Sequence, residues 1–191
     1  VTAFREALEK TCAERDKVIV LLNFPNNPTG YTPTEAEGQA IADALIAAAD
    51  GGTNVVVLTD DAYFSLFYGD TPMRESIFAK FAGVHPRLLA IKGDAATKEA
   101  YVWGLRVGFL TFSTEGAEED SPLYEALLSK VGGCVRSNIS NCCRLSQTIV
   151  RNALESGAFS AQRAEKVALM ERRAMRVREV LADPKYAEAW D

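Results

Sequence analysis

Val55-Val56-Val57-Leu58-Thr59 is a short, mostly β-branched run, and the polar stretch Asp60-Asp61-Ala62-Tyr63 follows it directly. Strands that are buried in a parallel sheet have continuous apolar runs of this kind. A second run, Val18-Ile19-Val20-Leu21-Leu22, leads in the same way into a turn-rich stretch from Asn23 to Gly30. Ligands of open α/β sheets bind beyond the carboxyl ends of the strands. The two runs therefore predict a parallel sheet with polar side chains gathered at one edge.

Helical patterns alternate with these runs. The expected order is helix 3–15, strand 18–22, helix 34–49, strand 54–59, short helix 74–81, strand 87–91, strand 106–112, and then helices that include 141–155 and 160–181. Thr34 and Glu37 have the spacing of a capping box at the start of the second helix. The alternation predicts a three-layer α/β/α fold, in which helices cover both faces of a mostly parallel sheet.

A third polar segment contains a lysine and an arginine eight residues apart. It runs Thr97-Lys98-Glu99-Ala100-Tyr101-Val102-Trp103-Gly104-Leu105-Arg106-Val107-Gly108. A lysine amine that is neutral for part of the time can form an imine with a carbonyl compound. Arginine stays charged and offers a planar fork of donors that suits phosphate. The segment therefore predicts a lysine that can bond covalently to a ligand and an arginine that holds an anion.

The polar residues behind the two strands complete a set of groups that could hold an aromatic ring. A carboxylate at Asp60 could pair with a protonated ring nitrogen, and Tyr63 could donate to a ring oxygen. Asn27 lies between prolines and close to Gly30, so its amide can be held rigidly as a donor. Asp60 could instead cap the next segment, which would leave Asp61 as the functional carboxylate.

In this order and spacing, the segments Asn26-Asn27-Pro28-Thr29-Gly30, Asp60-Asp61-Ala62-Tyr63 and Lys98 to Arg106 resemble the central motifs of the class I/II aminotransferases, which are fold-type-I pyridoxal-phosphate enzymes. The resemblance favours Asp60 over Asp61, because Tyr63 then follows three residues later, as in the family. It implies that pyridoxal 5'-phosphate is the cofactor and that Lys98 bonds to it and moves the proton.

The resemblance also implies roles for the other residues of these segments. Asp60 pairs with the pyridinium nitrogen, Asn27 and Tyr63 bind the ring hydroxyl oxygen, and Arg106 and Thr97 bind the cofactor phosphate. One position departs from the family pattern, because Ala95 stands where the family usually has a small hydroxyl residue. The third phosphate contact is therefore open. Tyr101 and Trp103 are expected to pack beneath the site.

The resemblance implies an aminotransferase that moves an amino group between an amino acid and a 2-oxo acid. The motifs bind the cofactor without choosing which bond of the substrate breaks, so a lyase or decarboxylase of the same fold stays open. A non-catalytic, aminotransferase-like sensor domain is the other alternative. By family, the intact protein is expected to be a homodimer.

The resemblance further predicts how the chain is divided. We expect residues 1–157 to form part of the large cofactor-binding domain, and residues 158–191 to form a long helix that leads toward a small domain absent from this sequence. Compared with the family, the start of the large domain and the small domain are missing. We therefore expect little or no transaminase activity from this chain alone, and we expect the long helix to expose part of its apolar face.

Composition excludes several other classes of protein. The chain has 191 residues, a net charge of -5 and a pI near 5.1, which argues against a nucleic-acid partner. No apolar run approaches the roughly 20 residues that a membrane span needs, so a cytoplasmic protein is expected. The four cysteines, Cys12, Cys134, Cys142 and Cys143, form no Cys-x-x-Cys pair, and His85 is the single histidine. No metal site is expected, and the cysteines are predicted to be free, buried thiols.

Overall fold

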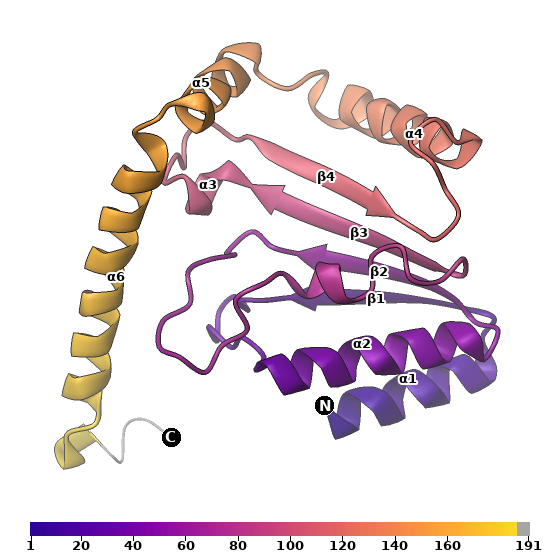
Figure 1. The fold of residues 1–191 in the computed structure, drawn as a ribbon, viewed down its shortest axis with the longest axis horizontal. Helices are drawn as coiled ribbons and strands as arrows, with labels where there is room; N and C mark the ends of the chain where they lie inside the picture. The colour runs from indigo at the N-terminus through magenta and orange to yellow at the C-terminus, as the bar shows by residue number, and fades with distance from the viewer. Residues whose placement is uncertain (187–191) are drawn as a thin grey trace.

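The computed structural model describes residues 1–186, and Figure 1 shows strands and helices in the alternation that the sequence predicts. Its elements are α1 (Thr2–Glu14), β1 (Lys17–Asn23), α2 (Glu35–Asp50), β2 (Asn54–Asp60), the 3-10 helix η1 (Ile77–Lys80), β3 (Leu88–Ala95), α3 (Ala96–Glu99), β4 (Gly108–Ser113), α4 (Pro122–Ile139), α5 (Arg144–Glu155), α6 (Phe159–Leu181) and the 3-10 helix η2 (Pro184–Tyr186). The α/β class is therefore confirmed.

The sheet has four strands in the order β1-β2-β3-β4. β1, β2 and β3 are parallel, and Asn23, Asp60 and Gly93 lie side by side in their shared register. β4 runs antiparallel to β3. The carboxyl ends of the three parallel strands consequently finish at one edge, as predicted.

One face of the sheet packs against α1 and α2 and forms the main core. Val55, Val57 and Leu88 point to this face and are fully buried, together with Leu45 from α2. Each such side chain contributes about 1.5–3 kcal/mol by leaving water. Thr34 caps α2 in the predicted capping box, so the helix begins where the sequence indicates. This packing fixes the sheet that supports the strand ends.

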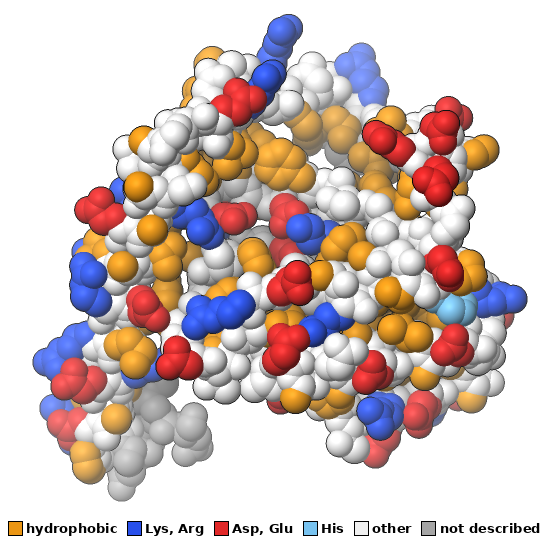
Figure 2. All heavy atoms as spheres, in the orientation of Figure 1, with side chains coloured by type: hydrophobic (Ala, Val, Ile, Leu, Met, Phe, Trp, Pro, Cys, Tyr) orange, Lys and Arg blue, Asp and Glu red, His pale blue; other side chains and the backbone are white. Residues whose placement is uncertain are grey.

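The opposite face is less completely covered than predicted. Ile19 and Leu21 of β1 point away from α1 and α2 and are 69% and 64% exposed. α4 lies on this side but leaves a groove of about 1120 Å³ between itself and the strands. Figure 2 shows hydrophobic side chains in the hollow beside α4. The prediction that helices cover both faces is therefore only partly met within residues 1–186.

Three local boundaries differ from the predicted ones. β3 continues past Ile91 to Ala95, because its backbone pairs with β4 along that whole length. The helix expected over 141–155 begins only at Arg144, since residues 140–143 form the connection from α4. The helix expected over 74–81 is reduced to η1. The long helix predicted within 158–191 is α6, and residues 187–191 of that range lie outside the described part.

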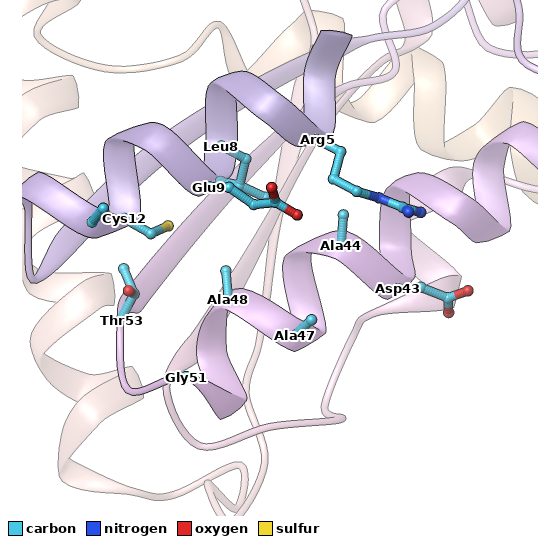
Figure 3. A pocket seen from close by; sticks show the side chains of 11 residues that line it. Arg5, Leu8, Glu9, Cys12, Asp43, Ala44, Ala47, Ala48, Gly51 and Thr53 are labelled. Atoms are coloured by element: carbon cyan, nitrogen blue, oxygen red, sulfur yellow. The ribbon is translucent and has the colours of Figure 1, made fainter. Parts of the chain in front are cut away.

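α1 and α2 enclose a groove of about 650 Å³, which Figure 3 shows from close by. Its walls are mainly small or apolar side chains such as Ala44, Ala48 and Leu8, with Arg5 and Asp43 at one end. None of the predicted site residues lines it. It is therefore a feature of the helix pair and not the candidate site.

The cysteines are free thiols, as predicted, but they are not buried. Cys134, Cys142 and Cys143 are exposed and Cys12 is partly buried. The prediction of buried thiols was wrong because Cys142 and Cys143 fall in the connection before α5, and Cys134 lies on α4, a helix in which no residue is buried.

Candidate active site

The carboxyl edge of the sheet gathers three segments that carry polar side chains. Figure 1 shows the turn after β1, the loop after β2 and α3 at the same end of the sheet, with α6 running alongside. Arg163 of α6 donates to the Ser65 hydroxyl in the loop and, over 3.3 Å, to the Glu99 carbonyl oxygen of α3. The Gly69 N–H donates to the Glu171 carboxylate of α6 over 3.4 Å. These contacts hold the edge together.

Asn27, Tyr63 and Lys98 meet at this edge. The side-chain amide of Asn27 donates to the Tyr63 hydroxyl over 3.4 Å. The Lys98 amine lies 4.5 Å from the centre of the Tyr63 ring, which is cation–π distance. The Asn27 backbone N–H donates to the Asn23 side chain over 2.8 Å, and this bond holds the turn in place. Three predicted site residues from three segments are thus neighbours.

A tightly bonded turn holds Lys98 in position. The Thr97 carbonyl accepts from the Val102 N–H over 3.1 Å, and the Ala96 N–H donates to the Val107 carbonyl over the same distance. Thr97 is 7% exposed. The short helix α3 is therefore anchored at both ends, and its lysine projects from a rigid support.

Asp60 and Asp61 point to opposite sides of the sheet, because successive strand residues alternate. Asp60 is only partly buried and lines the groove beside α4, together with Gly93 and Ala95. One of its oxygens accepts from the Ala62 N–H over 3.1 Å. Asp61 is 3% exposed on the core side, and burial raises its pKa to about 6. This arrangement favours Asp60 as the carboxylate that a ligand meets.

Arg106 lines a different groove, of about 660 Å³, between the start of β4 and α5. Its backbone has a left-handed φ of 53°, which turns its guanidinium toward the Trp103 carbonyl at 3.5 Å. Arg144 and Arg151 of α5 line the same groove. Arg151 is paired with Glu155 at 2.8 Å. The groove is therefore cationic, and the side chains of Asn27, Tyr63 and Lys98 do not line it.

The two aromatic residues between Lys98 and Arg106 differ in burial. The Tyr101 hydroxyl is buried and finds no hydrogen-bond partner within residues 1–186. Trp103 meets the Tyr101 ring edge to face at 6.2 Å but is 59% exposed. The prediction that Trp103 packs beneath the site was therefore wrong.

Sequence reasoning missed residues that act on the site through the fold. Arg144 and Arg163 looked like ordinary surface arginines of helices, and only the tertiary structure brings them to the cationic groove and to α3. Asn23 carried a usable signal, because it is the polar residue that directly ends the first apolar run. The burial of Asp61 gave no signal, since a charged residue after a strand is ordinarily exposed.

Two kinds of structure are absent from residues 1–186. No helix in that range is both long enough and apolar enough to pass through a bilayer. That range also contains no group of three or more His, Cys, Asp or Glu side chains that could hold a metal ion.

Known proteins resemble the chain in sequence. A family model described as aminotransferase class I and II matches residues 1–188. The cytoplasmic aspartate aminotransferase of Saccharomyces cerevisiae is 26% identical over 187 residues, which are 96% of this chain and 42% of that protein. An aspartate aminotransferase of Pyrococcus horikoshii is 28% identical over 131 residues, which are 69% of this chain and 30% of that protein.

Solved structures resemble it in fold. An aminotransferase from Anaerococcus prevotii has a TM-score of 0.73 at 24% identity, over 88% of this chain and 40% of that one. The aromatic-amino-acid aminotransferase from Burkholderia pseudomallei, covalently bound to pyridoxal phosphate, has a TM-score of 0.71 at 24% identity, over 94% of this chain and 42% of that one. The chain thus spans about two fifths of the length of these structures and of the yeast relative.

Proposed function

Because the chain belongs to the class I and II aminotransferase family, we propose that it binds pyridoxal 5'-phosphate and serves the transfer of an amino group between an amino acid and a 2-oxo acid. The observation that carries this proposal is the meeting of Lys98, Tyr63 and Asn27 at the carboxyl edge of the sheet. An amine, a phenol and an amide from three separate segments converge there. The homodimer that the resemblance implies, the cytoplasmic location expected from the sequence and the low activity of these 191 residues alone stay predictions.

The donors at this edge fit the ring oxygen of the cofactor. The Asn27 amide nitrogen and the Tyr63 hydroxyl are 3.4 Å apart. An oxygen placed beside both can lie within hydrogen-bond distance of each, because one amide N–H and the phenol O–H can turn toward the same acceptor. Asp60 supplies a carboxylate for a protonated ring nitrogen from the neighbouring strand end. The available groups therefore match the polar atoms of the ring.

Each residue then has a defined task. When bound, the cofactor supplies an electron sink that stabilises negative charge on the substrate carbon next to the amino group. Asp60 holds the proton on the ring nitrogen, which keeps that sink strong. Lys98 would hold the cofactor covalently through its Nζ atom, and the same amine, when free, would accept and return the proton of the substrate carbon. Tyr63 and Asn27 would orient the ring by hydrogen bonds to its oxygen, next to the Lys98 amine.

The phosphate is assigned to Arg106 and to the segment around Thr97. Ala95 offers no hydroxyl, so one hydrogen bond of the usual set is missing. Arg144 lines the same groove as Arg106 and supplies a second guanidinium there. Guanidinium groups bind phosphate through charge-assisted hydrogen bonds, which are stronger than those from a neutral hydroxyl. Arg144 is therefore proposed to replace the missing contact.

Covalent trapping tests the proposed function. The protein is titrated with pyridoxal 5'-phosphate, reduced with borohydride and mapped by peptide mass. We expect the label on Lys98 and expect Lys98→Arg to abolish it. Lys130→Arg, which changes an exposed lysine of α4, is the matched control and should keep it. A folded protein that takes up no label would overturn the proposal.

A further inference from the structure

Asp61 follows Asp60, the last residue of β2, and its side chain is buried on the opposite side of the sheet. Asp61 is 3% exposed, and its backbone N–H donates to the Gly93 carbonyl over 3.0 Å. One oxygen of its carboxyl group is buried and finds no hydrogen-bond partner within residues 1–186. A buried carboxyl oxygen without a partner disfavours the charged form. Asp61 is thus a titratable group that no ligand reaches and that the proposed mechanism does not use.

The groups that act on Asp61 come from two other segments. Lys92 and Asp94 of β3 form an ion pair of 2.9 Å, with side chains 24% and 22% exposed. Ser76, which caps η1, carries a hydroxyl that lowers the pKa of Asp61. Burial raises the pKa of Asp61 to about 6, Asp94 and Asp60 add to the rise, and Ser76 and Lys92 oppose it. The net result is a carboxyl group that changes charge close to neutrality.

We infer that Asp61 is a positioning residue, whose charge sets how strongly Asp60 holds a protonated pyridine nitrogen. The two aspartates are neighbours in the chain, so their α-carbons are about 3.8 Å apart. When Asp61 carries a proton, Asp60 alone faces the ring nitrogen. When Asp61 loses it, a second negative charge lies behind Asp60, and a cation at the ring nitrogen is held more strongly. This inference rests on the proposed function, because it needs the ring nitrogen beside Asp60.

The test compares cofactor affinity between two proteins across pH. The dissociation constant for pyridoxal 5'-phosphate is measured from pH 5 to 8 for the wild-type chain and for Asp61→Asn, which keeps the shape of the side chain and cannot ionise. The ratio of the two constants cancels the titration of the cofactor itself. We expect a ratio near one at pH 5 that rises, on the order of fivefold, by pH 8, with the variant weaker. A ratio that does not change with pH overturns the inference.

Controls separate this role from a structural one. Asp70→Asn removes an exposed carboxylate from the same loop and should give a flat ratio. Asp94→Asn is a second test in case Asp61→Asn fails to fold. It removes a charge that raises the pKa of Asp61, so the pH dependence of the affinity should shift to lower pH. An unshifted profile overturns the inference. Borohydride labelling distinguishes the two proposals: no label on wild-type Lys98 at any pH ends both, whereas a labelled protein with a flat ratio ends only this one.

Discussion

The Asn27 amide donates to the Tyr63 hydroxyl over 3.4 Å, and this bond joins the turn after β1 to the loop after β2. The two residues are 36 positions apart in sequence. Their meeting follows from the parallel register that sets Asn23 opposite Asp60. The two strands end side by side, so the turn after β1 and the loop after β2 can reach one another.

Tyr63→Phe should weaken the binding of pyridoxal 5'-phosphate by about threefold to tenfold, because it removes one hydrogen bond and leaves the ring beneath Lys98. Fluorescence titration measures the affinity. Tyr186→Phe, in η2, is the control and should bind as the wild type does. Unchanged affinity in Tyr63→Phe would show that the hydroxyl does not contact the cofactor.

Arg144→Gln should weaken binding of pyridoxal 5'-phosphate by about threefold to tenfold and leave the binding of pyridoxal, which lacks the phosphate, unchanged. Arg151→Gln is the matched control, since the Arg151 guanidinium is already paired with Glu155. Equal losses for both ligands, or no loss for either, would contradict a phosphate contact at Arg144.

The free energy of unfolding should depend on pH through Asp61. Its pKa is raised from 3.8 to about 6 in the folded chain, so the folded state binds this proton more tightly than the unfolded state. The resulting stability is fully present below pH 4 and is lost as the pH rises through 6. The free energy of unfolding of Asp61→Asn, taken relative to that of the wild type, should therefore increase by roughly 2 to 3 kcal/mol from pH 4 to pH 7.5. Urea unfolding without cofactor measures this difference, and an equal difference at both pH values would contradict the buried titration.

Thr34→Ala should destabilise the chain by about 1 kcal/mol, because it removes the side-chain half of the capping box at the start of α2. The backbone N–H and then the hydroxyl of Thr34 lower the pKa of Glu37, as expected for a carboxylate that accepts both bonds. Urea unfolding at pH 7 measures the change in the free energy of unfolding. Thr11→Ala in the last turn of α1 is the control and should cost little, since alanine is the better helix former. Equal effects of the two substitutions would argue against the cap.

Several elements of this fold can be predicted from short stretches of sequence alone. The apolar runs at 18–22 and 55–59 and the capping box at Thr34 each specify an element without reference to the rest of the chain. The strand ends then place Asn27 and Tyr63 at one edge by geometry alone. Local pattern was therefore sufficient for β1, β2 and the side chains that follow them.

Other features depend on contacts between distant segments, and the sequence did not show them. β3 extends through Lys92 and Asp94, although charged residues are not typical of a buried strand. The two side chains form an ion pair, and β4 supplies the hydrogen-bond partners of their backbone. Asp61 is buried, and the groups that act on its pKa, Ser76, Lys92 and Asp94, come from other segments of the chain. Arg144 reaches the groove of Arg106 only through the position of α5.

Arg163 gives the long helix α6 a direct connection to the lysine. Its guanidinium bonds to the Glu99 carbonyl and, at 3.4 Å, to the Glu99 carboxylate, and Glu99 is the next residue after Lys98. The same side chain bonds to Ser65, two residues beyond Tyr63. A rotation of the helix about its axis would therefore shift the amine and the phenol together. The first turns of α6 are thus attached to both segments that carry the residues proposed to hold the cofactor.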